Sequence, residues 1–280
     1  MPRIAVITDS SALIPPETIR QYGIEIAPLH LLWDGKVYRD GVDMQPEEFF
    51  KKLRKSPTLP TTSGAIQAEF IRIFEALRGR VEHIVIFLLS KDLSAAYNSA
   101  MVARNLFSEM AIELVDTRTS LMAMGFAVRA AAKAALQGAG KEAVIKTAMD
   151  ILAKAHLFVE LDTLEWLRRG GRVNMPAAMM AKWLKVKPIM TIREGKALPI
   201  ARPLTRSRAM NHLVRLVKEH LTETPLHICI HHADAAEEAE TLRKRIVQAF
   251  HPAEILTRPF TPIIGAHTGP GTLGVAFHNE

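Results

Sequence analysis

Hydroxyl and carboxylate side chains recur in the first half of the chain, each time directly after a short apolar run. One such run is followed by Thr8, Asp9 and Ser10, and a later one by Asp116 and Thr117. If these runs are strands of an open parallel sheet, their carboxyl ends meet at one edge, where α/β proteins bind their ligands. The polar groups then serve either as caps of the following helices or as contacts for an anionic group such as a carboxylate or a phosphate.

Three more hydroxyl groups precede predicted helices, those of Thr62, Ser63 and Ser94. Ser94 has none of the flanking glycines of the G-x-S-x-G turn that exposes a serine nucleophile, so a role in binding is favoured over a catalytic one. Asp9 and Asp116 are weak candidates for a shared Mg²⁺, because no phosphate-binding loop with a lysine accompanies them. The capping interpretation is therefore preferred for both carboxylates.

In the second half, Arg172 follows the glycine pair Gly170 and Gly171. The leucines before this pair share a helical face, so one interpretation is a helix cap that leaves the arginine in solvent. The other is a flexible link that brings the arginine to an anion, because the planar guanidinium matches a carboxylate or a phosphate. Both interpretations stay open on the residues alone.

His267 stands before a glycine-rich segment that contains Gly269, Gly271 and Gly274. These glycines formally satisfy G-x-G-x-x-G, but only six residues follow Gly274, too few for a dinucleotide-binding unit. We expect instead a rigid loop that closely approaches a ligand or the other half of the chain. His267 is then either a structural histidine or part of the site.

The composition limits the class of protein. The chain has 280 residues, of which 48% are hydrophobic, and this excludes disordered and disulfide-scaffold proteins. No apolar stretch approaches the roughly 18 residues of a membrane-spanning helix, and the single cysteine, Cys229, is expected in a buried strand. His227, His231 and His232 lack the H-E-x-x-H pattern of a zinc helix, so we expect neither a metal nor a cofactor. A cytoplasmic location is the simplest expectation.

Positive charge is concentrated in one segment of the chain. There are 36 Lys and Arg against 29 Asp and Glu, a net charge of +7. Residues 168–218 hold 13 of these bases and one acid, Glu194, which gives the segment +12 and leaves −5 for the rest. If exposed, this segment suits an acidic protein partner or an anionic membrane surface; the alternative is a set of solvated helix faces. Nucleic acid is not favoured, because no recognition motif is present.

The elements that must position these residues alternate between strands and helices. Strands are predicted over residues 4–7, 24–32, 84–89, 112–115, 157–159, 188–192 and 227–231. Helices are predicted to begin near residues 16, 46 and 64 and to cover residues 95–107, 120–136, 141–153, 176–184, 207–221 and 235–250. This alternation predicts an α/β protein, with an N-terminal three-layer domain on a parallel sheet (1–153) and a C-terminal α/β domain with a mixed sheet (154–280).

Taken together, seven segments of the chain resemble the DegV family of bacterial fatty-acid-binding proteins. They cover residues 7–11, 60–63, 89–97, 115–117, 170–172, 187–189 and 267–271. The resemblance implies an acyl chain buried between and within two α/β domains, with its carboxylate bound by Thr62, Ser94, Arg172 and His267. The loops expected to support this site contain Thr8, Asp9, Ser10, Ser63, Asp116, Gly170, Gly171, Gly269 and Gly271.

The chain departs from the family pattern at two places. The family's L-S-G-T-Y is here Leu93-Ser94-Ala95-Ala96-Tyr97, and its T-S-Q-P is here Thr62-Ser63-Gly64-Ala65. The two hydroxyl groups that the resemblance assigns to the carboxylate, at Thr62 and Ser94, are retained.

The leading hypothesis is therefore a protein that binds a long-chain fatty acid in an apolar tunnel and has no catalytic activity of its own. The resemblance further implies that it is the acyl-binding subunit of a fatty-acid kinase and presents the carboxylate to a separate ATP-using subunit. The alternative hypothesis is an enzyme, a phosphotransferase or a hydrolase, that uses Ser94 and His267 on a small anionic substrate.

Overall fold

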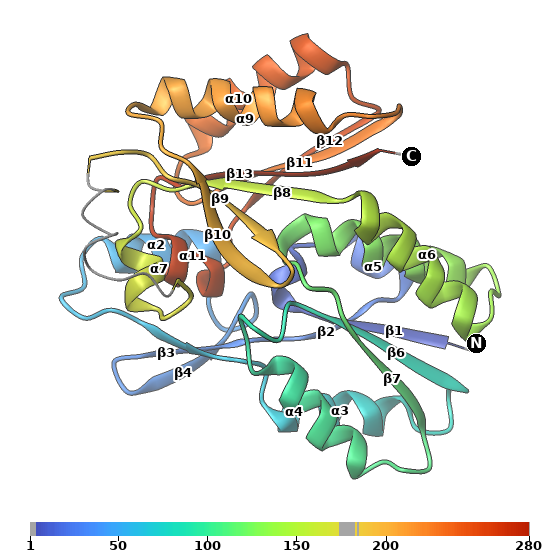
Figure 1. The fold of residues 1–280 in the computed structure, drawn as a ribbon. Helices are drawn as coiled ribbons and strands as arrows, with labels where there is room; N and C mark the ends of the chain where they lie inside the picture. Colours follow the sequence, from blue (N-terminus) through green and yellow to red (C-terminus); the bar gives the residue numbers. More distant parts are fainter. Residues whose placement is uncertain (1–3, 174–182, 184, 280) are drawn as a thin grey trace.

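The structure is a computed structural model that describes residues 4–173, 183 and 185–279. Two large sheets lie one above the other, with helices between them and on both outer sides (Figure 1). The helix predicted over residues 176–184 falls almost entirely outside the described residues. The expected α/β class, with a parallel sheet followed by a mixed sheet, is confirmed.

The first sheet has four parallel strands in the order β2-β1-β6-β7. Their bounds are β1 (Ile4–Asp9), β2 (Glu25–Ala27), β6 (His83–Leu88) and β7 (Ala111–Asp116). Every residue of β1 is buried, as expected for a parallel strand covered on both faces. The covering helices are α1 (Pro16–Tyr22), α3 (Gln67–Leu77), α4 (Ala96–Asn105), α5 (Leu121–Leu136) and α6 (Lys141–Lys154). A 3-10 turn, η1 (Ser10–Ala12), follows β1.

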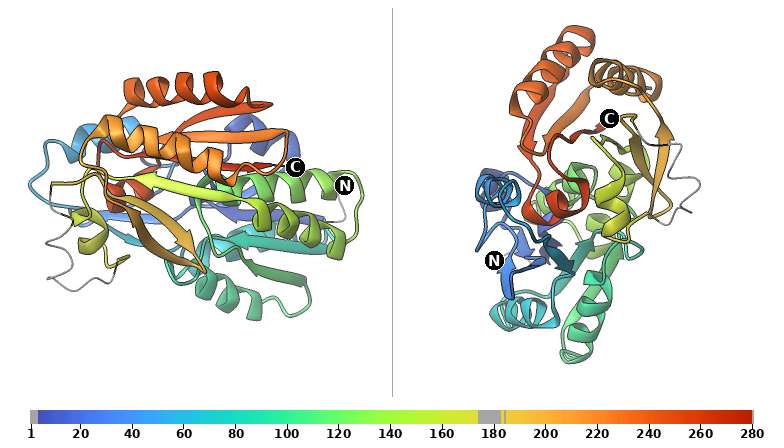
Figure 2. Two further views of the ribbon diagram at one scale, coloured as in Figure 1. Left: turned by 45° about the horizontal axis from the view of Figure 1, so that its top comes forward. Right: turned by 90° about the vertical axis from the view of Figure 1, so that its left-hand side faces the viewer.

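The second sheet has six strands in the order β10-β9-β8-β13-β11-β12, and only the β11–β12 pair is parallel. Their bounds are β8 (His156–Glu160), β9 (Ile189–Arg193), β10 (Lys196–Ala201), β11 (Leu226–His232), β12 (Glu254–Pro259) and β13 (Leu273–Asn279). Helices α9 (Arg206–His220) and α10 (Ala236–Phe250) cover its outer face (Figure 2). Helix α5 contacts both β1 and β13, so it lies between the two sheets.

A third, small antiparallel sheet was not anticipated. It consists of β4 (Lys36–Arg39), β3 (His30–Trp33) and β5 (Thr61–Ser63), with α2 (Pro46–Leu53) inserted between β4 and β5. The single extended stretch predicted over residues 24–32 is in fact two strands, β2 and β3, which belong to different sheets. Two short helices complete the fold, α7 (Glu165–Arg169) after β8 and α11 (Pro262–Thr268) before β13.

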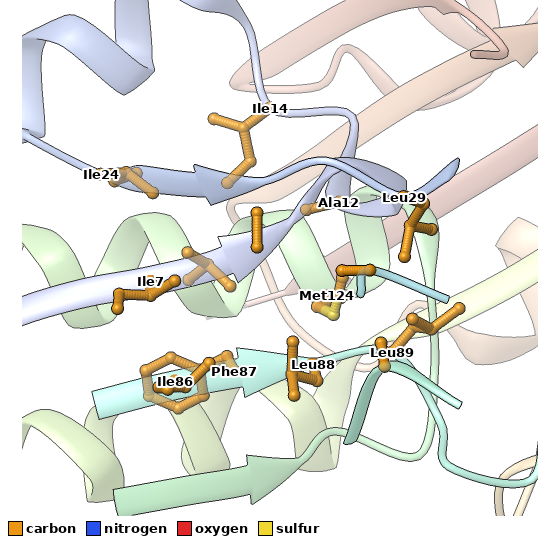
Figure 3. Packing of buried hydrophobic residues seen from close by; sticks show 14 of the residues in the cluster. Ile7, Ala12, Ile14, Ile24, Leu29, Ile86, Phe87, Leu88, Leu89 and Met124 are labelled. Atoms are coloured by element: carbon orange, nitrogen blue, oxygen red, sulfur yellow. The ribbon is translucent and has the colours of Figure 1, made fainter. Parts of the chain in front are cut away.

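One large apolar cluster links the first sheet to the second. Figure 3 shows part of it, with Ile86, Leu88 and Met124 packed between β6 and α5. The same cluster continues to Cys229 of β11 and Ala276 of β13. Cys229 is fully buried in its strand, as predicted, and burial raises the pKa of its thiol. The division of the chain at residues 153 and 154 stays a prediction; α6 ends at Lys154, next to this point.

Candidate functional site

An apolar cavity lies between the ends of the first sheet and the inner face of the second. About 860 Å³ of space, part of it open to solvent, lies between its walls. Strand β8 lines it with Leu157 and Val159, and Leu161, the residue directly after the strand, continues the same alternation, so the three face one side. Leu29 and Leu89, at the ends of the first-sheet segments in Figure 3, line the opposite wall.

Polar side chains gather at one end of this cavity. The four residues that the resemblance assigned to a carboxylate, Thr62, Ser94, Arg172 and His267, all line it. They come from four separate segments: the small sheet, the loop before α4, the turn after α7, and α11. Ser63 lines the cavity beside Thr62.

Thr62 and His267 are already joined to each other across 205 residues of sequence. Their side chains share a hydrogen bond of 2.7 Å between Thr62 Oγ1 and His267 Nε2. Burial, and the nearby positive charge of Arg172, lower the pKa of His267 to about 3. The imidazole is therefore neutral near pH 7 and donates a hydrogen bond from one nitrogen only.

Arg172 is a partly buried cation that forms no ion pair with any acidic side chain in the described parts of the chain. Its Nε donates to the carbonyl of Leu93 at 3.2 Å and its Nη1 to the carbonyl of Gly170 at 2.5 Å. Burial lowers the pKa of its guanidinium. A buried charge without a counter-ion is costly, so this end of the cavity favours an anion.

The backbone that follows Ser94 makes a tight contact with Gly64. The Oγ of Ser94 accepts a hydrogen bond from Ala96 N at 3.2 Å, in the first turn of α4. A Cβ atom on Gly64 would lie 2.5 Å from that same nitrogen and 3.0 Å from Ala95 C. The two departures from the family pattern, at 64–65 and 95–96, therefore face each other across one contact.

The acidic residues predicted beside the site are structural. Asp9 is fully buried, and its carboxylate accepts hydrogen bonds from Ser11 N and Leu89 N, both at 2.9 Å. Burial raises the pKa of Asp9 even though these hydrogen bonds lower it. Asp116 accepts from Arg118 N at 3.0 Å and lies 4.0 Å from Lys91. Asp9 therefore caps the 3-10 turn η1, as preferred from the sequence, whereas Asp116 binds within a turn and does not cap α5, which begins at Leu121 after Ser120.

Ser10 belongs to a bridge that reaches α11, the helix of His267. Its hydroxyl accepts from Leu29 N at 3.1 Å and donates to Asp40 at 2.7 Å, and Asp40 in turn accepts from Ile263 N at 3.0 Å. Burial raises the pKa of Asp40 to about 6. Asp40 was not identified from the sequence, because no apolar run precedes it.

The remaining supporting positions shape turns. Thr8 is a buried residue of β1 and does not line the cavity. Gly171 and Gly271 have φ values of +69° and +81°, a region that favours glycine, and Gly271 N donates to Ala233 O at 2.7 Å. Gly170 and Gly269 lie against the rings of His267 and Trp166.

The basic segment is partly neutralised within the structure. Arg168 and Arg169 pair with Glu165, Lys187 pairs with Asp162, and Arg206 pairs with Glu160. A second group lines an open surface cleft at the start of α9; its basic members are Arg202, Arg208, His212 and Arg215. Among the helices that the structure describes, none is long and apolar enough to cross a membrane.

Comparison with known proteins identifies relatives that match along the whole chain. Residues 3–280 match the family described as "Uncharacterised protein, DegV family". A DegV domain-containing protein of Clostridium perfringens is 32% identical over 99% of both chains. The crystal structure of DegV from Bacillus subtilis, described as a fatty acid binding protein, has a TM-score of 0.92 at 28% identity over 100% of both chains. A structure that describes fatty acid binding by a DegV family protein of Thermus thermophilus also has a TM-score of 0.92, at 25% identity over 99% of this chain and 100% of that one.

Proposed function

This chain belongs to the DegV family, and we propose that it binds one long-chain fatty acid, with the carboxylate at Thr62, Ser94, Arg172 and His267 and the tail along β8. The observation that carries the proposal is Arg172, a cation with no acidic partner among the described residues, at one end of a cavity whose walls are otherwise largely apolar. Relatives described as fatty-acid-binding proteins support it.

The tail would supply most of the affinity. Burying a methylene group is worth roughly 0.8 kcal/mol, so about 15 methylenes give roughly 12 kcal/mol before the costs of association are subtracted. The alternating face of Leu157, Val159 and Leu161 offers a wall of this kind. Four strand steps of about 3.3 Å extend this wall over about 13 Å, which suits an extended acyl chain.

The polar end would fix the direction of the ligand. A carboxylate accepts hydrogen bonds and cannot donate them. Arg172 and the hydroxyl group of Ser94 can donate to it directly. If neutral His267 donates from Nε2 to Thr62 Oγ1, the Thr62 hydroxyl proton is left for the carboxylate. A fatty alcohol or a methyl ester of the same length lacks the charge that compensates Arg172, so it would bind more weakly.

The arrangement argues against the alternative of an enzyme that uses Ser94 and His267. His267 Nε2 bonds to Thr62, and Ser94 Oγ accepts from Ala96 N. A histidine with a pKa of about 3 is a poor general base near pH 7, because efficient proton transfer needs a pKa near the working pH.

Native mass spectrometry of the purified protein tests the proposal. We expect a mass increment equal to one fatty acid, and lipid extraction should identify it. Delipidated protein should take up palmitate and should bind methyl palmitate at least tenfold more weakly, the equivalent of about 1.4 kcal/mol. Delipidated protein that takes up neither ligand would refute the function. Turnover of an acyl ester or phosphate that is lost in Ser94→Ala would favour the enzyme.

We also propose that the chain presents its bound acid to a separate ATP-dependent kinase subunit. Docking is assigned to the cleft at the start of α9, because Arg202 and Arg208 form no ion pair with any described acid and an acidic partner surface would complement them. An anionic membrane surface has the same charge complementarity and is the alternative occupant. Both expectations follow from the basic 168–218 segment.

Charge reversal separates docking from acyl binding. The variant Arg202→Glu/Arg208→Glu should lose binding to the acidic partner and keep its palmitate affinity, because neither arginine lines the acyl cavity. Flotation with vesicles of phosphatidylglycerol, compared with phosphatidylcholine, reports on the membrane alternative. Equal loss of docking and palmitate binding would refute this separation. The control Lys244→Glu changes an exposed lysine of α10, outside the cleft.

A further inference from the structure

Two segments at the polar end of the cavity interlock through glycines and aromatic rings. Helix α7 and the turn after it carry Trp166 and Gly170, whereas α11 and the turn after it carry His267 and Gly269. The ring of each segment lies against the glycine of the other. A Cβ atom on Gly170 would stand 2.2 Å from His267 Nδ1, and one on Gly269 would stand 2.3 Å from Cδ1 and Nε1 of Trp166.

The two contacts differ in what the glycine backbone requires. Gly269 has φ +74° and ψ 169°, a conformation that is essentially restricted to glycine. Gly170 has φ −73° and ψ −6°, which any residue adopts. Glycine at position 170 is therefore explained chiefly by the His267 ring, because the next obstacle, Trp166 O, lies 3.3 Å from the Cβ position.

This packing determines where the His267 ring can lie. Its Nδ1 is buried against Gly170 and forms no hydrogen bond with the described residues, while its Nε2 reaches Thr62. The same Gly170 accepts a hydrogen bond from Arg172 through its carbonyl and donates one to Trp166 O at 2.9 Å. Trp166 itself does not line the cavity.

We propose that Trp166 is a positioning residue for the fatty-acid carboxylate, acting by holding the turn after α11 against α7 so that the His267 ring stays between Gly170 and Thr62. The inference rests on the proposed function of the cavity and adds to it a residue that does not touch the ligand. It makes His267 and Arg172 one rigid unit, because both are held through Gly170.

The test compares two ligands that differ only at the head group. In Trp166→Ala, the affinity for palmitate should fall about tenfold, the loss expected when one hydrogen bond to a charged group is misplaced, whereas the affinity for methyl palmitate should change less than twofold. Trp166→Phe keeps a ring on Gly269 and should restore most of the palmitate affinity. Tyr22→Ala is the matched control, since Tyr22 is partly buried in the same apolar cluster and lies outside the cavity.

A double-mutant cycle tests the second contact. Gly170→Ala should weaken palmitate binding in the native background, but it should cost nothing further in His267→Ala, where the ring that it would strike is gone. Equal losses for palmitate and methyl palmitate in Trp166→Ala, or unchanged palmitate affinity, would overturn the inference. These results leave the proposed function intact, because that function is judged by the native protein's own preference for palmitate over its ester.

Discussion

Replacing Gly64 by alanine should weaken fatty-acid binding although Gly64 itself offers no side chain to the ligand. The added Cβ would lie 2.5 Å from Ala96 N and 3.0 Å from Ala95 C. Carbon atoms in contact normally stand about 3.5–4.0 Å apart, so the first turn of α4 must retreat by about 1 Å. Because both obstructing atoms belong to the backbone, no side-chain rotation relieves the contact.

The expected magnitudes follow from this retreat. Overpacking of this kind costs about 1–3 kcal/mol of stability, offset in part by the roughly 0.4–1 kcal/mol that Gly→Ala gains from the unfolded chain. Ser94 precedes this turn and moves with it, away from Thr62. Losing one hydrogen bond to a charged acceptor costs about 1.5–3 kcal/mol, which raises the Kd for palmitate by roughly 10- to 150-fold.

Titration calorimetry with palmitate and urea unfolding measure the two effects separately. Gly140→Ala is the matched control, because Gly140 has φ −70° and a Cβ there would meet no atom within 4 Å. That control should bind palmitate as the native protein does. A Gly64→Ala variant with native affinity and native stability would refute the reasoning, because α4 would then accommodate the added Cβ without cost.

Three further predictions concern the head group, the tail and acid stability. Arg172→Ala should lose palmitate affinity by at least tenfold. Its free energy of unfolding in urea should stay within about 1 kcal/mol of the native value, because the partners of Arg172 are carbonyl groups at the edge of the cavity. A much larger loss of stability would show that Arg172 is structural. Val159→Trp should fill the middle of the wall and abolish palmitate uptake, measured by native mass spectrometry, while unchanged uptake would place the tail elsewhere. His231 is fully buried, and burial lowers its pKa to about 3. Below about pH 6.5 His231 therefore binds a proton in the unfolded chain but not in the folded chain. The free energy of unfolding falls as the pH drops from there toward 3. His231→Phe should reduce this fall by about 1.4 kcal/mol per pH unit near pH 5 in urea titrations, and an unchanged slope would contradict the shift.

Much of the first sheet could be predicted because short apolar runs in the sequence indicate its strands. The runs at β1 and β6 are continuous and apolar, and the run at β7 is interrupted by Glu113. The helix starts at Pro16 and Pro46 were also found, because proline at the first helical position is a strong signal. Strands β1 and β6 are buried on both faces, and a run of consecutive apolar residues predicts such strands well.

The small sheet and the last strand could not be predicted for the opposite reason. Strand β5 consists of Thr61, Thr62 and Ser63, which have no apolar alternation, and it pairs with β3 some thirty residues earlier. Strand β13 follows the glycine-rich turn and pairs in the centre of the second sheet with β8 and β11. Their pairing partners are distant in sequence, so tertiary contacts decide their structure.

The candidate site shows the same division. The polar residues were found from the resemblance, whereas the wall from β8 and β9 and the bridging Asp40 were not. Leu157, Val159 and Met190 have ordinary strand patterns, and nothing local distinguishes a cavity wall from a packed core. Of the twelve methionines of the chain, Met190 is the one that lines the described part of the cavity.

The central claim is that the cavity holds a fatty acid with its carboxylate among Thr62, Ser94, Arg172 and His267. A crystal structure of the protein with palmitate tests this most directly. The account predicts elongated density along β8, with the carboxylate within hydrogen-bond distance of Thr62 Oγ1 and Ser94 Oγ. Density for palmitate outside the cavity, or inside it with the carboxylate beside Leu157, would contradict the account.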